Sequence, residues 1–149
     1  MEHLKMLMPV LLVLPPLAAA QAAPADVAAA VAMKARPAEA VKLDESRRPA
    51  EVLGYLGLEK GDSALDLFTG TGYYAETMAH AVGSQGSIVA WEPANFHDAA
   101  AQVKWDALEV RTGNADLLVN PANKLSLPPD AFDFVLVHMV YQDFYCRTE

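Results

Sequence analysis

The most constraining stretch of this chain is SALDLFTGTGYYAETMA, residues 63–79. Apolar residues around Asp66 predict a short strand, and the turn Gly70-Thr71-Gly72 joins it directly to a predicted helix from Tyr73 to Val82. Glycine allows positive φ and close approach of a ligand to the backbone. The start of the following helix offers unpaired N–H groups and the positive end of a dipole. The stretch therefore predicts a ligand-binding turn between a strand and a helix.

Strand and helix signals alternate along the chain. Before the first strand, Pro49 suits the first turn of a helix that Gly57 or Gly61 ends, with Asp44 or Ser46 as its N-cap. The predicted strands are Ala64–Phe68, Ser87–Trp91, Glu109–Arg111 and Phe134–His138. A further helix, Phe96–Leu108, is predicted between the second and the third strand. This alternation predicts an α/β fold with a parallel sheet, the first strand central and the fourth beside it.

Composition bounds the class of protein. The 149 residues are 53% hydrophobic and 20% charged, which fits one globular domain rather than a disordered chain. The net charge of −8 argues against a nucleic-acid partner and against an anionic membrane surface. A single cysteine, Cys146, permits no intrachain disulfide. We expect no metal site, because the histidines are scattered: His3, His80, His97 and His138.

The N-terminus has the pattern of a secretory signal peptide over residues 1–22. Lys5 precedes an apolar run, and Ala20-Gln21-Ala22 fits the small-x-small cleavage pattern. We therefore expect export, with a periplasmic location and a mature chain that begins near Ala23. No later apolar stretch is long enough for a membrane span. Residues 23–43 are rich in alanine and proline and indicate a linker or a weak helix.

Two ligand classes, dinucleotides and S-adenosylmethionine, bind to a strand, a glycine turn and a helix in this order. Gly70 to Ala75 satisfies the dinucleotide pattern, in which a pyrophosphate lies on the helix end. Asp66 distinguishes the two classes. An acid inside the strand suits a positively charged amine and has no use beside a pyrophosphate. The turn therefore favours S-adenosylmethionine over NAD.

The residues from Asp66 to Gly72 resemble the first motif of the class I S-adenosylmethionine-dependent methyltransferases. Phe68 stands where that motif has its first glycine, so this part of the turn is bulkier. The surrounding sequence, with Tyr73-Tyr74, Glu76 and LPPDAFDFVLVHMVYQDFY, resembles a bacterial family of predicted exported methyltransferases. The resemblance covers about residues 44–145 and implies a Rossmann-like sheet.

The resemblance implies roles for several residues. Asp66 would receive the amino group of S-adenosylmethionine, and Gly70 and Gly72 would give its amino-acid end room. Glu92, at the end of the second strand, would accept the ribose hydroxyls. Each acid also has a purely structural interpretation: Asp66 could brace the turn, and Glu92 could cap a helix.

Other candidates follow the third and fourth strands. Asn114 and Asp116 compete for a contact to the adenine amine, and both are also ordinary turn residues. His138 and Tyr141 lie at or beyond the end of the fourth strand, where a methyl acceptor would bind. His138 could act as a base, although packing or orienting roles are the simpler interpretation.

The resemblance also implies a larger sheet than the strands predicted here. We therefore expect residues 44–149 to be the N-terminal, cofactor-binding part of a methyltransferase domain that is truncated at its C-terminus. The fourth strand would then have an uncovered edge, through which copies could associate. Three functions remain: methyl transfer to an unknown acceptor, an exported non-catalytic binding module, or, more weakly, a dinucleotide-dependent oxidoreductase.

Overall fold

The computed structural model describes residues 22–145 of the chain. They form a parallel sheet with the strand order β3-β2-β1-β4, which confirms the predicted α/β class and the central place of the first strand. The strands are β1 (Ser63–Leu67), β2 (Ser87–Pro93), β3 (Ala115–Asn120) and β4 (Phe134–Leu136). The signal-peptide residues lie outside the described residues except for Ala22, so export stays a prediction; Cys146 lies outside them too.

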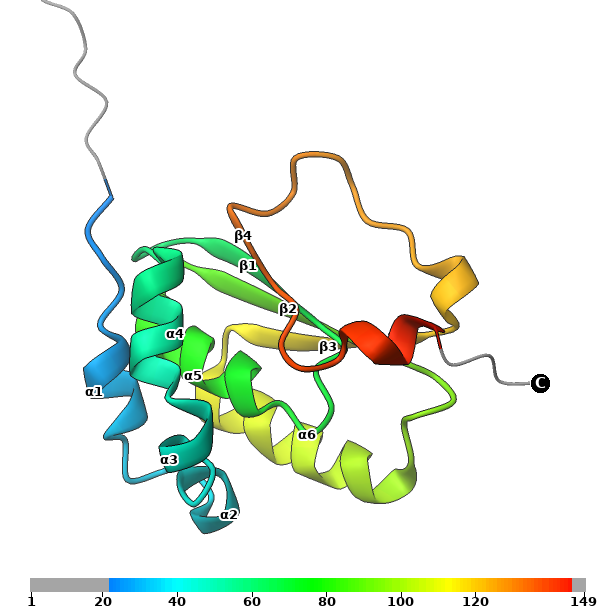
Figure 1. The fold of residues 1–149 in the computed structure, drawn as a ribbon, viewed down its shortest axis with the longest axis horizontal. Helices are drawn as coiled ribbons and strands as arrows, with labels where there is room; N and C mark the ends of the chain where they lie inside the picture. The colour runs from blue at the N-terminus through cyan, green and yellow to red at the C-terminus, as the bar shows by residue number, and fades with distance from the viewer. Residues whose placement is uncertain (1–21, 146–149) are drawn as a thin grey trace, which may run out of the picture.

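Helices gather along one face of this sheet, whereas the long segment between β3 and β4 extends away from them (Figure 1). No helix within residues 22–145 has the length and apolar character needed to cross a membrane. The helices and the 3-10 segments are α1 (Val27–Val31), α2 (Ala38–Val41), α3 (Asp44–Arg47), α4 (Pro49–Leu56), α5 (Tyr73–Val82), α6 (Ala99–Thr112), η1 (Ala122–Lys124) and η2 (Tyr141–Tyr145).

The central element of the core is α5, which has the predicted bounds. Met78 and Thr77 on this helix have no exposed surface, and Trp105 of α6 and Leu53 of α4 are equally buried. Pro49 occupies the first turn of α4, and Gly57 ends it in the left-handed conformation, as the sequence predicts. Because the strands are parallel, their carboxyl ends meet at one edge of the sheet, beside the start of α5.

The third strand is wrongly predicted. Glu109–Arg111 belongs to α6, which continues to Thr112 and ends at Gly113 with a φ of 70°. The misleading residue is Val110, a β-branched side chain that is 86% exposed on the outer face of the helix. The true strand, β3, therefore begins later, and its carboxyl end is Asn120.

The segment 23–43 packs as part of the domain rather than as a loose linker. Val27 and Ala30 of α1 are buried in the core. The N–H of Ala25 donates to the carbonyl of Leu58, at 2.9 Å. Apolar alanine-rich helices of this length depend on such packing, because an isolated short helix is unstable in water.

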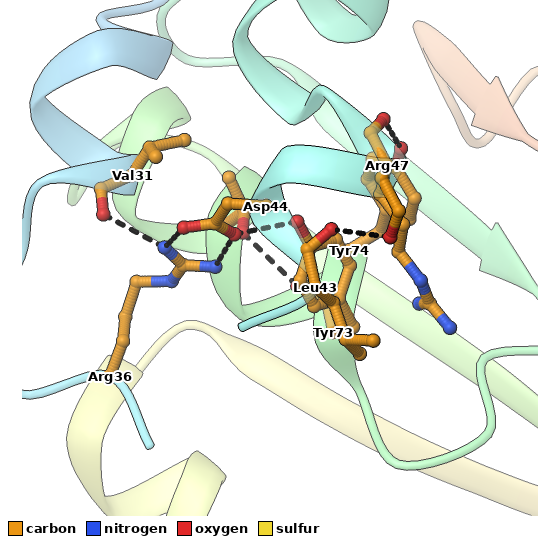
Figure 2. A network of polar contacts seen from close by, with 9 residues as sticks. Val31, Arg36, Leu43, Asp44, Arg47, Tyr73 and Tyr74 are labelled. Carbon is orange, nitrogen blue, oxygen red and sulfur yellow. Dashed lines mark hydrogen bonds and ion pairs between the residues drawn. The ribbon is translucent and has the colours of Figure 1, made fainter. Parts of the chain in front are cut away.

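A partly buried ion pair fixes this N-terminal layer to α5 (Figure 2). The guanidinium of Arg36 donates two hydrogen bonds of 2.8 Å to the two carboxylate oxygens of Asp44, and a third to the carbonyl of Val31. The hydroxyl of Tyr73, the first residue of α5, donates to Asp44 at 2.7 Å. The network thus positions the residue that follows the glycine turn.

We expect Asp44→Ala to lower the free energy of unfolding by about 2–4 kcal/mol, because it leaves the buried Arg36 guanidinium without its counter-charge. Hydrogen bonding to Arg36 lowers the pKa of Asp44. Its contribution is therefore present above the ordinary aspartate pKa and disappears as the pH falls through the lower folded-state pKa. Urea denaturation at neutral and acidic pH measures both effects.

The matched control is Glu45→Ala, the neighbouring exposed acid on the same helix. It should change stability by less than about 0.5 kcal/mol. Equal losses for the two variants would contradict the role of the ion pair.

Candidate functional site

The candidate site is the turn between β1 and α5, residues 68–72, which we name the site loop. Three of its residues have left-handed backbone: Phe68 at φ 68°, Gly70 at 60° and Gly72 at 83°. The N–H groups of Phe68 and Thr69 both donate to the carbonyl of Trp91 on β2, at 2.8 and 3.0 Å. The loop is therefore held at the carboxyl edge of the sheet.

Phe68 shows how a side chain replaces glycine in this turn. A positive φ is unfavourable for a bulky residue. The Phe68 ring packs edge-on against Trp91, with centroids 5.6 Å apart, and against Phe96, at 5.1 Å. Aromatic packing therefore offsets the conformational cost.

Asp66 is a buried carboxylate beneath the loop. Its side chain accepts a 2.7 Å hydrogen bond from the hydroxyl of Thr69, and the residue is 4% exposed. Burial raises the pKa of Asp66 to about 6, while the bond from Thr69 opposes the rise. Asp66 forms no ion pair with any residue in the range 22–145.

Glu92 lies at the corresponding end of β2 and is also 4% exposed. It accepts a 2.7 Å hydrogen bond from the N–H of Gly70, the middle of the site loop. Burial raises the pKa of Glu92, and its charge in turn helps to raise the pKa of Asp66. Glu92, like Asp66, has no ion-pair partner in the part of the chain that the structure describes. Two unneutralised carboxylates thus flank the loop.

The two glycines of the loop have different surroundings. A Cβ atom on Gly70 would meet nothing within 4 Å, so this backbone faces open space. A Cβ atom on Gly72 would overlap Leu108 Cδ1 and would lie 3.0 Å from Trp105 Cζ2. Gly70 is therefore the place where a ligand can approach, whereas Gly72 is required for the packing of α6.

Asn114 and Asp116 do not reach the loop. The Asn114 amide donates to three carbonyls at the amino end of the sheet, those of Ala79, Gly83 and Gly86. Asp116 is exposed, and it pairs with Val89, which precedes Glu92 along β2 and so lies further from the carboxyl edge of the sheet. Their proposed adenine contact depended on the misplaced third strand, so it is not supported by this geometry.

Asn120 occupies the position that the misplaced strand had given to those residues. It is the last residue of β3, and its side-chain oxygen accepts a 2.7 Å hydrogen bond from Trp91 Nε1. No signal in the local sequence identifies it, because the pairing of β3 with β2 alone sets which residue reaches the edge.

The two catalytic candidates have different environments. His138 follows β4, and its ring lies 4.5 Å from the ring of Tyr74 on α5. Burial lowers the pKa of His138, which keeps the imidazole neutral and able to accept a proton near neutral pH. Tyr141 is 69% exposed and shares a 2.9 Å hydrogen bond with Tyr145. The structure thus brings His138, and not Tyr141, towards α5.

A cavity of about 300 Å³ lies behind the site loop, between α2, α5 and α6. Thr71, Tyr73 and the buried Glu76 are among the residues that line it, whereas Asp66 and Glu92 do not. The cavity thus adjoins the site loop at Thr71 but does not include the carboxylates of Asp66 and Glu92. No cluster of potential metal ligands occurs in residues 22–145.

The chain resembles known methyltransferases. The sequence profile of the protein-L-isoaspartate(D-aspartate) O-methyltransferase family matches residues 28–119. Demethylmenaquinone methyltransferase of Geobacillus kaustophilus (strain HTA426) is 30% identical over 88 residues, which are 58% of this chain and 36% of that protein.

Two solved structures are similar to this chain. A SAM-dependent methyltransferase from Aquifex aeolicus superposes with a TM-score of 0.50 and 28% identity, over 67% of this chain and 55% of that one. A protein-L-isoaspartate O-methyltransferase gives a TM-score of 0.47 and 26% identity, over 60% and 28%. The similarity to the Aquifex aeolicus structure shows that the fold is of the class I methyltransferase type. The chain spans less than two thirds of the length of these relatives.

We expect Gly72→Ala to destabilise the fold by about 2–4 kcal/mol, because the new methyl group overlaps Leu108 and Trp105 and the backbone remains left-handed. Gly70→Ala is the matched control. It adds a methyl group in open space and should cost only about 1–2 kcal/mol for the left-handed conformation. Thermal denaturation of both variants measures the difference, and a larger loss for Gly70→Ala would contradict this assignment.

Proposed function

The chain belongs to the protein-L-isoaspartate(D-aspartate) O-methyltransferase family, and on this premise we propose that it binds S-adenosylmethionine at the site loop and transfers its methyl group to an acceptor. The observation that carries the proposal is the pair of buried carboxylates, Asp66 and Glu92, on either side of the open backbone at Gly70. The relatives whose names state methyl transfer support it.

The donor groups suit this molecule. A buried carboxylate is costly without a cation or hydrogen-bond donors, and these two have no ion-pair partner in residues 22–145. Asp66 would bind the ammonium group, and Glu92 would accept the ribose hydroxyls. One Glu92 oxygen already accepts from Gly70, but a carboxylate has about four acceptor positions, so capacity remains.

S-adenosylmethionine, when bound, supplies an electrophilic methyl group. The residues of this chain contribute mainly by holding the reactants in line, because displacement at a methyl carbon depends on alignment. His138 would accept a proton where the acceptor must lose one, since its imidazole is held neutral. A pyrophosphate of NAD at the start of α5 would instead meet the buried carboxylate of Asp66, which disfavours the oxidoreductase alternative.

We expect Asp66→Asn and Glu92→Gln each to weaken S-adenosylmethionine binding by roughly tenfold to a hundredfold, because each removes a charge-assisted hydrogen bond. Binding to the wild type should weaken as the pH falls through the Asp66 pKa of about 6, because protonation removes the negative charge. Asp66→Asn should not lower the free energy of unfolding at pH 7. A raised folded-state pKa means that the charged form destabilises the fold above that pH. Calorimetric titration and denaturation check both expectations.

The control is Asp106→Asn, an exposed acid on α6, which should leave affinity unchanged. A wild type that binds NAD more tightly than S-adenosylmethionine would overturn the proposal. Binding without transfer of a labelled methyl group to any acceptor of a cell extract would instead favour the non-catalytic binding module.

We also propose that copies of the chain associate through β4, which pairs with β1 alone among the described strands. Val135 on β4 is 53% exposed, and Val137 and Met139 beyond it are exposed too. An apolar strand with an unpaired edge favours pairing with a second strand.

Sedimentation velocity should therefore show dimer formation that increases with concentration, and Val135→Lys should abolish it by placing a charge on that strand. Val110→Lys, the same substitution at an exposed position of α6, should leave association unaltered. A wild type that stays monomeric at every concentration would refute this association.

A further inference from the structure

Trp105 is a tryptophan of α6 whose side chain has no exposed surface, and it lies 35 residues beyond Gly70 in the sequence. Its Nε1–H donates a 2.9 Å hydrogen bond to the carbonyl oxygen of Gly70. The benzene half of the same indole lies against Gly72, where an added Cβ atom would be 3.0 Å from Cζ2. One side chain of α6 therefore supports the site loop at two points.

The two peptide groups that flank Gly70 are held by different side chains. The N–H of Gly70 donates to Glu92 on β2 at 2.7 Å, and its carbonyl accepts from Trp105. Gly70 has a left-handed φ of 60°, and a glycine has little conformational preference of its own. The orientation of both peptide groups therefore depends on these two side-chain bonds.

The hydrogen bond of Trp105 has a structural purpose, because a buried indole N–H needs an acceptor. The acceptor, however, belongs to the residue whose N–H binds Glu92. The carbonyl and the N–H share one Cα atom, so a displacement of the carbonyl also moves the N–H and the carboxylate that it holds. Trp105 is thus connected to Glu92 through a single residue.

We propose that Trp105 is a positioning residue for ligand binding, which acts through Gly70 to hold the Glu92 carboxylate in the orientation that accepts the ribose hydroxyls. This rests on the proposed function and deepens it. Because Trp105 has no exposed surface, it acts without touching the ligand. An oriented carboxylate loses less conformational freedom when the ligand binds, so its orientation contributes to affinity.

Two substitutions separate the hydrogen bond from the packing. Trp105→Phe keeps an aromatic ring in the core but removes the N–H donor. Trp105→His keeps a ring N–H close to the place of Nε1, because the five-membered rings superpose, but it removes the benzene half of the indole. We expect Trp105→Phe to weaken binding of S-adenosylmethionine by about threefold to tenfold, which corresponds to one neutral hydrogen bond. Trp105→His should weaken binding less, although the cavity that it leaves lowers the Tm more.

The loss of affinity should lie in the recognition of the ribose. Adenosine carries the ribose without the amino-acid group, so Trp105→Phe should weaken its binding by the same factor. In a Glu92→Ala background there is no carboxylate to position. Adding Trp105→Phe to Glu92→Ala should therefore change affinity by less than about twofold, whereas its effect on the Tm should persist. Calorimetric titration and thermal denaturation measure the two quantities separately.

Leu53→Val is the matched control, because it shortens a fully buried side chain of α4. It should lower the Tm and leave the affinity for both ligands unchanged. Wild-type affinity in Trp105→Phe would overturn the inference, as would affinities of the two Trp105 variants that simply follow their Tm values. Either result leaves the proposed function intact, because the wild type still binds S-adenosylmethionine.

A wild type that binds neither ligand would refute the proposed function together with the inference. The comparison of Trp105→Phe with its combination with Glu92→Ala decides even if Trp105→His fails to fold.

Discussion

The hydrogen bonds of one residue, Gly70, hold the site together. Its N–H donates to the buried carboxylate of Glu92 on β2, and its carbonyl accepts from Trp105 Nε1 on α6, at 2.9 Å. Both backbone groups of a left-handed glycine are thereby satisfied by side chains from separate elements. The loop is therefore fixed before a ligand arrives, and the space beside Gly70 is a property of the sheet and of α6, not of the loop alone.

A second set of contacts connects that loop to the N-terminal layer. The Arg36–Asp44 pair holds the hydroxyl of Tyr73, and the Tyr73 ring supports the guanidinium of Arg47. Segment 23–43 thus has a functional consequence, although its composition indicates a linker or a weak helix. Its Arg36 fixes, through Asp44, the position of Tyr73 at the start of α5.

The carboxylates of the site are costly to the fold. Burial raises the pKa of Asp66 and of Glu92, so the ionised carboxylates lower the stability of the folded chain at neutral pH. Buried carboxylates without an ion-pair partner, as these two are within residues 22–145, are typical of ligand-binding positions, where the ligand supplies the cation. Stability and binding are therefore opposed at Asp66.

The sequence by itself determined the elements whose signals are local. The β1 strand, the glycine turn, the bounds of α5 and the stop at Gly57 follow from apolar patterning and from glycine conformations, and the positions of Asp66 and Glu92 at strand ends follow from them. Only the tertiary structure decided the rest. Val110 favours a strand in the local sequence, but the segment is helical because Trp105 and Leu108 bury the opposite face of α6 in the core. The pairing of β3 with β2 then places the end of β3 at Asn120. Gly72 acquires its role from residues distant in sequence, because the packing of α6 is a non-local property that no spacing along the chain encodes.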